Sequence, residues 1–162
     1  MRVVSNTSPI CNLAIIGRLE LLPRRYGGGS IPREVALELG AMSHQAARSQ
    51  IQAALARGWL RVEDTTLLPS LSLPVRLDAG ELAAMALGVA VRADVLLIDE
   101  KRGRVAARAL GLAVSGLLGE LLHARLQGWI PNLRDEIARL RLHAGFFVDA
   151  EIEAFITSQV GE

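Results

Sequence analysis

The chain has 162 residues, of which 51% are hydrophobic and 4% aromatic, and its formal net charge at pH 7 is +1. This length is most simply one domain, large enough to bury a core of Leu, Val, Ile and Ala without disulfides or a structural metal. No apolar run approaches the roughly 18 residues that span a bilayer, and the first residues lack the pattern of a signal peptide. With no membrane segment and a single cysteine, Cys11, expected to be a buried, reduced thiol, we expect a cytoplasmic protein.

The first part of the chain combines a short strand with helical pieces. Residues 2–5 favour a strand, and Ser8 before Pro9 is typical of a helix N-cap followed by proline at the first helical position. A second helical piece at residues 19–23 is expected to end at its proline. The glycines at residues 27–29 indicate a turn, because they lack the strand–GxGxxG–helix context of a dinucleotide site.

Residues 30–76 favour short strands, helices and one polar loop. The helix that opens at Pro32 carries Val35, Leu39 and Met42 on one face. In chain order we expect a strand at residues 30–31, that helix, a helix at 44–57 ended by Gly58, an edge strand at 59–62 and a loop at 63–76.

The second half of the chain begins with Asp78-Ala79-Gly80-Glu81, which has the Asp-x-x-Glu form of a capping box. We expect the helix that follows to face the core with Leu82, Met85, Ala86 and Val89. Residues 95–98 form an apolar run typical of a strand buried on both faces. Beyond it we expect a helix at 101–110, a strand at 112–114, a helix at 117–127 and amphipathic C-terminal helices at about 132–159.

Strands that alternate with helices predict an α/β fold, a three-layer α/β/α sandwich with a mostly parallel sheet of four to five short strands. We expect a single domain over residues 1–162. The C-terminal helices at about 132–159 are expected to pack on it or to form an oligomer contact.

Polar side chains follow the first and fourth predicted strands. Asn6 ends the first and Asp99 ends the fourth, and in this topology both ends lie near the switch point of the sheet, where open α/β folds bind ligands. Glu81 begins a helix on the same side, and Glu38 belongs to a helix that would pack across the mouth. Three carboxylates and an amide suit Mg²⁺ or Mn²⁺, which lower the pKa of bound water for in-line attack on a phosphodiester.

Each of these residues also has a simpler explanation. Asp99 or Glu100 would cap the following helix, and Glu81 completes a capping box without any metal. Glu38 would be a solvated helix residue. Glu34, one helical turn earlier, is an alternative candidate for the same position in the site. Asn6 would hold the turn between strand and helix. The three histidines show no ligand spacing, so zinc is not expected.

Three segments of the chain together resemble the PIN domain family of metal-dependent single-strand nucleases. They are V-V-S-N-T-S-P at residues 3–9, G-E-L-A-A at 80–84 and L-I-D-E-K-R-G-R at 97–104. Their order and spacing are similar to those of a prokaryotic PIN-like branch that includes VapC-like toxins. The resemblance spans roughly residues 1–130.

The resemblance implies the positions of the site. The metal-binding quartet of the family carries over to Asn6, Glu38, Glu81 and Asp99, of which the three acids are the expected catalytic residues, with Glu100 beside the last. As weaker substrate contacts, the hydroxyl-bearing stretch beside the metal carries over to Thr7 and Ser8, and the family's Gly-Arg pair to Arg104.

Asn6 departs from the family pattern, which has aspartate there. An amide oxygen ligates a hard cation but brings no negative charge. At an effective dielectric of about 20, a charge lost beside a divalent ion changes the interaction by several kcal/mol before solvent compensation. We therefore expect weaker metal binding than in a site with four acids.

The resemblance implies a Mg²⁺- or Mn²⁺-dependent endoribonuclease that cleaves single-stranded RNA. It also implies a toxin of a toxin–antitoxin pair, neutralised by a small antitoxin protein, and a homodimer. The alternative is a catalytically weakened module that binds RNA or a protein. A third interpretation, a small-molecule α/β domain, lacks support because neither GxGxxG nor a P-loop is present.

Overall fold

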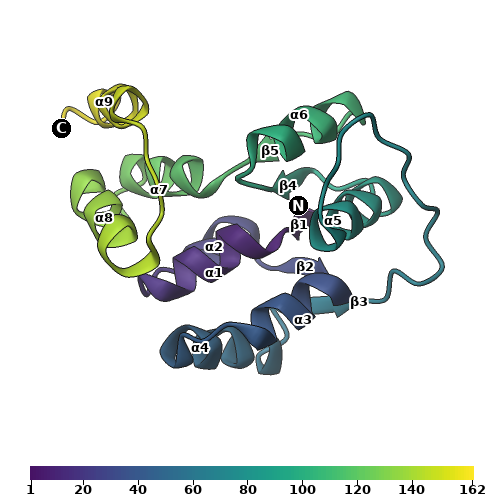
Figure 1. Ribbon diagram of the computed structural model, residues 1–162. Helices are drawn as coiled ribbons and strands as arrows, with labels where there is room; N and C mark the ends of the chain where they lie inside the picture. Colours follow the sequence, from purple (N-terminus) through teal and green to yellow (C-terminus); the bar gives the residue numbers. More distant parts are fainter.

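A computed structural model describes residues 1–162, and at its centre is a five-stranded sheet in which all neighbouring strands are parallel (Figure 1). The strand order is β3-β2-β1-β4-β5. The strands are β1 (Val3–Ser5), β2 (Gly29–Pro32), β3 (Leu60–Glu63), β4 (Val95–Leu97) and β5 (Val114–Ser115). The five predicted strands are confirmed, with bounds shifted by at most two residues, and β3 lies at an edge as expected.

Helices connect successive strands, as parallel pairing requires. They are α1 (Thr7–Ile15), α2 (Leu21–Tyr26), α3 (Arg33–Ala41), α4 (Gln45–Ala56), α5 (Ala79–Ala90), α6 (Lys101–Ala109), α7 (Leu117–Leu126), α8 (Leu133–Arg139), the π-helical turn η1 (Leu140–Ala144) and α9 (Ala150–Ser158). Pro23 does not end α2 as predicted. It lies in the first turn, where its missing N–H leaves no bond unmade, so α2 continues to Tyr26.

The helices cover both faces of the sheet, which confirms the three-layer α/β/α architecture. Val3 and Leu97 belong to the larger core, with side chains from α1, α2, α3, α4, α7, α8 and α9. Val4, Leu96 and Ile98 belong to a smaller core with α5 and α6. Because successive strand residues point to opposite faces, both faces of β1 and β4 are buried. Figure 1 shows α5 and α6 on the opposite side of the sheet from α1 and α2.

The prediction that Ser8 is the N-cap of the first helix is wrong. The helix α1 begins at Thr7, and its N-cap residue is Asn6, whose side chain makes no capping hydrogen bond. The Ser8 hydroxyl instead donates to Asp99 Oδ2 at 2.6 Å. The Ser8 hydroxyl therefore binds Asp99, which is distant in the sequence, instead of a backbone N–H of its own helix. Pro9 lies in the first turn of α1, where a proline is tolerated.

The predicted core face of α5 is also wrong in part. Met85 is fully buried, but Leu82 and Ala86 are half-buried and Val89 is 41% exposed. The face that packs on the sheet contains small residues, and a Cβ added to Gly88 would meet Leu112 at 3.3 Å. The buried residues of α5 are Gly80, Glu81, Ala84, Met85, Leu87 and Gly88. Close packing of a helix on a sheet requires small side chains. A prediction based on the spacing of large apolar residues does not identify such a face.

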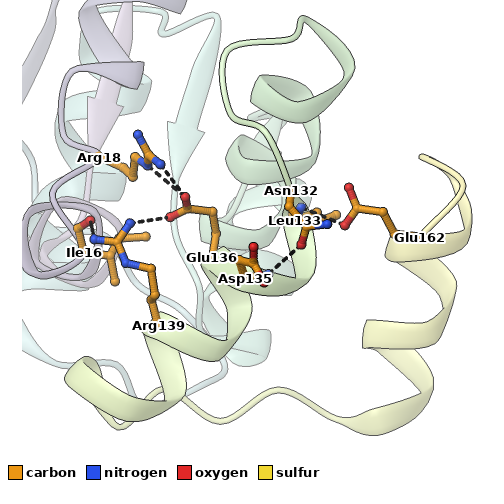
Figure 2. Close-up of polar contacts among 8 residues, drawn as sticks. All are labelled: Ile16, Arg18, Asn132, Leu133, Asp135, Glu136, Arg139 and Glu162. Atoms are coloured by element: carbon orange, nitrogen blue, oxygen red, sulfur yellow. Dashed lines mark hydrogen bonds and ion pairs between the residues drawn. The ribbon is translucent and has the colours of Figure 1, made fainter.

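The C-terminal helix α8 is fixed to the end of α1 by buried charges (Figure 2). Glu136, 2% exposed, accepts hydrogen bonds from Arg18 and Arg139. Arg139 also donates to the carbonyl of Ile16 at 2.7 Å. At the other end of α8, the Glu162 carboxylate accepts from the Leu133 N–H at 2.8 Å.

None of the helices combines the length and apolar character needed to cross a membrane.

Candidate functional site

The carboxyl ends of β1 and β4 meet in the middle of the sheet. The two strands pair from Val3 opposite Val95 to Ser5 opposite Leu97. The strand order reverses between them, because β2 and β3 continue on one side and β5 on the other. This is the switch point at which open parallel sheets bind ligands. Asn6 comes directly after β1, and Asp99 comes two residues after the end of β4.

Asn6 leaves β1 with one polar atom unsatisfied. Its N–H donates to the Leu97 carbonyl at 2.9 Å, which ties the turn to β4. The residue is 6% exposed, and its side-chain Oδ1 is buried without a hydrogen-bond partner. A buried acceptor left unpaired costs about 1–3 kcal/mol. This oxygen is therefore available to a ligand that accepts an electron pair.

The next two residues of the turn each hold one of the predicted acids. The Thr7 hydroxyl donates to the Glu38 carboxylate, and the Ser8 hydroxyl donates to Asp99. Both residues therefore contact the acids predicted for the site, although their proposed contact with substrate stays a prediction. One short turn thus presents an unpaired amide oxygen next to hydroxyls that fix two carboxylates from other elements.

Asp99 is half-buried just beyond the end of β4. Nearby hydrogen-bond donors partly compensate the burial of its carboxylate. Its Oδ1 accepts the N–H of Leu117 at 2.7 Å, at the start of α7, where the helix dipole favours negative charge. Arg104 donates to the Asp99 carbonyl oxygen. Burial raises the pKa of Asp99, and the hydrogen bonds from Leu117 and Ser8 and the charge of Arg104 oppose that rise.

Glu81 is 5% exposed, and the predicted capping box is present. Its Oε2 accepts the Asp78 N–H at 3.1 Å, and its own N–H donates to Asp78 at 2.8 Å. Burial is the largest cause of a raised pKa at Glu81, and the negative charges of Asp78, Glu100 and Glu38 raise it further. The simpler explanation of Glu81 as a cap is thus correct, and the residue also lies among other acids.

A glycine lies against each of the three predicted acids. A Cβ added to these glycines would meet the carboxylate oxygen at 2.5 Å for Gly80 and Glu38, at 3.3 Å for Gly103 and Glu81, and at 3.0 Å for Gly116 and Asp99. The first two glycines belong to the motifs G-E-L-A-A and L-I-D-E-K-R-G-R. Their lack of a side chain leaves room for the carboxylates between neighbouring helices.

The acids form two adjacent groups rather than one tight cluster. The charge of Glu38 raises the pKa of Glu81, whereas Asp99 lies with Ser8 and Leu117. Glu100 is the shared neighbour, because its charge raises the pKa of both Glu81 and Asp99. No three acidic, histidine or cysteine side chains lie close enough together to hold a metal ion.

The chemistry of these atoms fits a hard divalent cation. The unpaired Asn6 Oδ1 is an oxygen donor without another role, and carboxylate and amide oxygens are the ligands that Mg²⁺ and Mn²⁺ prefer. The raised pKa values of Glu81 and Asp99 reflect buried negative charge, which a bound cation would compensate. Glu38, Glu81 and Asp99 are now engaged by hydrogen bonds within the protein.

Sequence reasoning missed the start of α7 as a part of this site. The Leu117 N–H holds Asp99, and Gly116 makes room for its carboxylate. A signal was present, because Ser115-Gly116 stands between a predicted strand and a predicted helix, at the same edge of the sheet as Asp99.

A cavity of about 420 Å³ opens beside Asp99, between α6 and the loop that precedes α9. Its walls are formed by Ser8, Asn12, Asp99, Glu100, Lys101, Arg104, Ala144, Gly145, Phe146 and Phe147. The largest cavity, about 550 Å³, is lined by Gly28, Trp59, Arg61 and other residues that include none of the predicted site residues. Chemistry rather than size therefore identifies the candidate site.

Comparisons with known proteins agree with this architecture. A search of the solved structures matches a PilT N-terminus domain protein from the hyperthermophilic archaeon Sulfolobus solfataricus P2, with a TM-score of 0.56 and 20% identity over 76% of this chain and 93% of that one. At this identity the likeness shows the fold alone. Among curated proteins, none matches the sequence.

The family comparison covers nearly the whole chain. The family model DUF3368, described as a PIN domain, matches residues 2–162. PIN domains are generally metal-dependent nucleases. The match includes all three motifs of the sequence and the C-terminal helices beyond them. The chain therefore belongs to the PIN domain family.

Proposed function

We propose that this protein is a metal-dependent endoribonuclease that cleaves single-stranded RNA. The observation that carries the proposal is the buried, unpaired Oδ1 of Asn6, in a turn whose hydroxyls fix Glu38 and Asp99. An unpaired oxygen donor at the switch point of the sheet, followed in the chain by hydroxyls that hold two carboxylates, is the arrangement expected for a hydrolytic metal centre.

Each residue has a defined part in this proposal. Mg²⁺ or Mn²⁺ would be held by Asn6, Glu38, Glu81 and Asp99, whose three acids do not form a metal-binding cluster in the protein alone and would have to move closer together around the ion. When bound, the ion supplies a water of lowered pKa and neutralises phosphate charge. Asp99 is held in place by the Ser8 hydroxyl and the Leu117 N–H, so its carboxylate would be oriented toward the ion. Arg104 is held beside Asp99 and has further N–H groups for a phosphate oxygen.

Cleavage of single-stranded RNA in the presence of Mn²⁺ tests this function. We expect activity that EDTA abolishes and that Asp99→Ala also abolishes. Glu151→Ala, which removes an exposed acid from the first turn of α9, is the matched control and keeps full activity. Equal activity in the wild type and Asp99→Ala would show that the catalytic site lies elsewhere.

A second candidate is favoured by the neutral residue at position 6 and by the separation of the acids. With one negative charge fewer, the protein would be a weakened PIN domain that binds RNA or a protein partner. RNA binding without cleavage, and recovery of cleavage in Asn6→Asp, would support this candidate over an active nuclease.

A toxin role with a small antitoxin protein, and a homodimer, extend the proposal. Exposed apolar side chains on α9, Ile152 at 50% and Phe155 at 66%, support a protein contact there. Growth arrest on expression of the wild type but not of Asp99→Ala would support the toxin role. Light scattering should give twice the chain mass of 17.4 kDa, and a monomer would contradict the dimer.

A further inference from the structure

The loop between η1 and α9 is anchored on both sides of one exposed aromatic residue. Gly145, with φ +61°, ends the π-helical turn, and the Phe146 N–H returns to the Leu140 carbonyl at 3.2 Å. Phe146 packs against the larger core. Val148 is 5% exposed, and its carbonyl accepts from Arg141 at 3.1 Å. The loop therefore has a fixed backbone course.

Phe147 lies between these two anchors and is 84% exposed. Full burial of such a ring stabilises a protein by about 1.5–3 kcal/mol. Phe147 does not gain this stabilisation, because the rest of the chain leaves its ring exposed. Single exposed apolar residues are common, so exposure alone indicates no function. The location of Phe147 does indicate a function, because Phe147 lines the same cavity as Asp99.

The cavity combines the features of a site for a single-stranded nucleic acid. Lys101 and Arg104 contribute positive charge, Asp99 and Glu100 contribute carboxylates, and Phe147 contributes an aromatic side chain. A volume of about 420 Å³ falls within the range of small-ligand sites. Proteins that bind single strands pair cationic grooves with aromatic side chains on which bases stack.

We infer that Phe147 is a stacking platform for a base of the RNA strand, next to the phosphate that reaches Asp99. This inference rests on the proposed function. Because every base has a π-face, stacking on one ring holds the strand with little sequence preference. The anchored loop places the ring before substrate arrives, so little conformational entropy is lost on binding.

Equilibrium binding of a fluorescein-labelled single-stranded RNA of randomised sequence tests the inference, measured by anisotropy in EDTA so that cleavage does not interfere. Phe147→Ala should weaken binding about tenfold, since stacking contributes about 1–3 kcal/mol per base. Phe147→Trp should retain the affinity and Phe147→Leu should lose it, because only the former keeps a π-face. Leu67→Ala, which removes a 96% exposed apolar side chain that does not line the cavity, is the control and should bind like the wild type.

A spectroscopic signal separates stacking from a general apolar contact. An RNA that contains 2-aminopurine should lose fluorescence on binding the wild type and Phe147→Trp, and keep it with Phe147→Leu. Equal affinity in Phe147→Leu and the wild type would overturn the stacking role. In cleavage assays with Mn²⁺, Phe147→Ala should raise KM more than it lowers kcat.

The failure of this inference is distinguishable from that of the nuclease proposal. If the wild type binds RNA without cleaving it and Phe147→Ala weakens that binding, the platform stands and the nuclease proposal fails. If the wild type cleaves RNA and Phe147→Ala changes neither affinity nor KM, the platform fails alone. If the wild type neither binds single-stranded RNA nor cleaves it with Mn²⁺, both are overturned.

Discussion

At the scale of single residues, opposing effects act on the pKa of Asp99. Its carboxylate is half-buried, which raises its pKa, although Leu117, Ser8 and Arg104 partly compensate. A folded state with a raised carboxyl pKa binds the proton more strongly than the unfolded state does. The stabilisation from protonated Asp99 is therefore present at low pH and is lost as the pH rises through the raised pKa.

This linkage predicts the behaviour of Asp99→Asn. Cleavage should be lost, whereas the free energy of unfolding at neutral pH should equal or exceed that of the wild type, because the substituted amide carries no buried charge. Relative to the variant, the wild type should become less stable as the pH rises from acidic to neutral. Denaturant titrations across this range provide the measurement, and a variant that is markedly less stable at neutral pH would argue against a destabilising carboxylate.

Asn6 gives the complementary prediction. Asn6→Asp should bind Mn²⁺ about tenfold more tightly by calorimetry, because it adds a charge at the unpaired oxygen. Without metal the variant should be about 1–3 kcal/mol less stable, since a buried carboxylate is then uncompensated. Thermal unfolding with and without Mn²⁺ measures both effects. Unchanged Mn²⁺ affinity would place the metal away from Asn6.

At the scale of helices and strands, the site depends on close approach between elements. α5 packs through small residues, and Gly80 in its first turn leaves space for Glu38 from α3. Thr7 at the start of α1 holds the same carboxylate. The position of Glu38 is therefore set by two helices other than its own.

Gly80→Ala tests this arrangement. The added Cβ would lie 2.5 Å from Glu38 Oε1, so the exposed, flexible carboxylate must move. Because alanine favours a helix over glycine by up to about 1 kcal/mol, stability should hold or rise while RNA cleavage falls at least about tenfold. Gly40→Ala in α3, with nothing within 4 Å of the added atom, is the control. Equal activity in both variants would remove Glu38 from the catalytic set.

At the scale of the whole molecule, the end of η1 and the loop after it form one wall of the cavity beside Asp99. Before η1, the helix α8 is tied to the end of α1 through Glu136, Arg18 and Arg139 (Figure 2). The ion pairs thus connect the loop that carries Phe147 to the helix that follows Asn6. We expect stability and RNA affinity to depend together on this connection.

Glu136→Ala should therefore reduce the free energy of unfolding by about 2–4 kcal/mol, because it leaves two arginines without their buried partner. The expected cost lies toward the low end, since both arginine side chains are partly exposed. Asp135→Ala, which removes the exposed neighbouring acid, should change stability by less than about 1 kcal/mol. Urea unfolding compares the two variants. Similar losses in the free energy of unfolding would show that the ion pairs of Glu136 add no more stability than an exposed acid does.

The sequence by itself determined the features that depend on near neighbours. The apolar run before Asp99 marked a buried strand, the Asp78–Glu81 pattern marked a capping box, and the alternation of strands and helices marked a parallel α/β sheet. These signals are local, since a strand's alternation or a helix cap is set by residues within one or two turns. The order of three motifs was enough to indicate the PIN family, which the family match confirmed.

The tertiary structure alone decided what these residues contact. Ser8 donates a hydrogen bond to Asp99 instead of capping the helix, α5 packs small residues rather than Val89 on the sheet, and Phe147 lines the same cavity as Asp99. No local pattern encodes these relations, because each joins elements far apart in the chain whose distance is fixed by core packing. The structure likewise placed the acids in two adjacent groups, which the sequence had predicted as a single pocket.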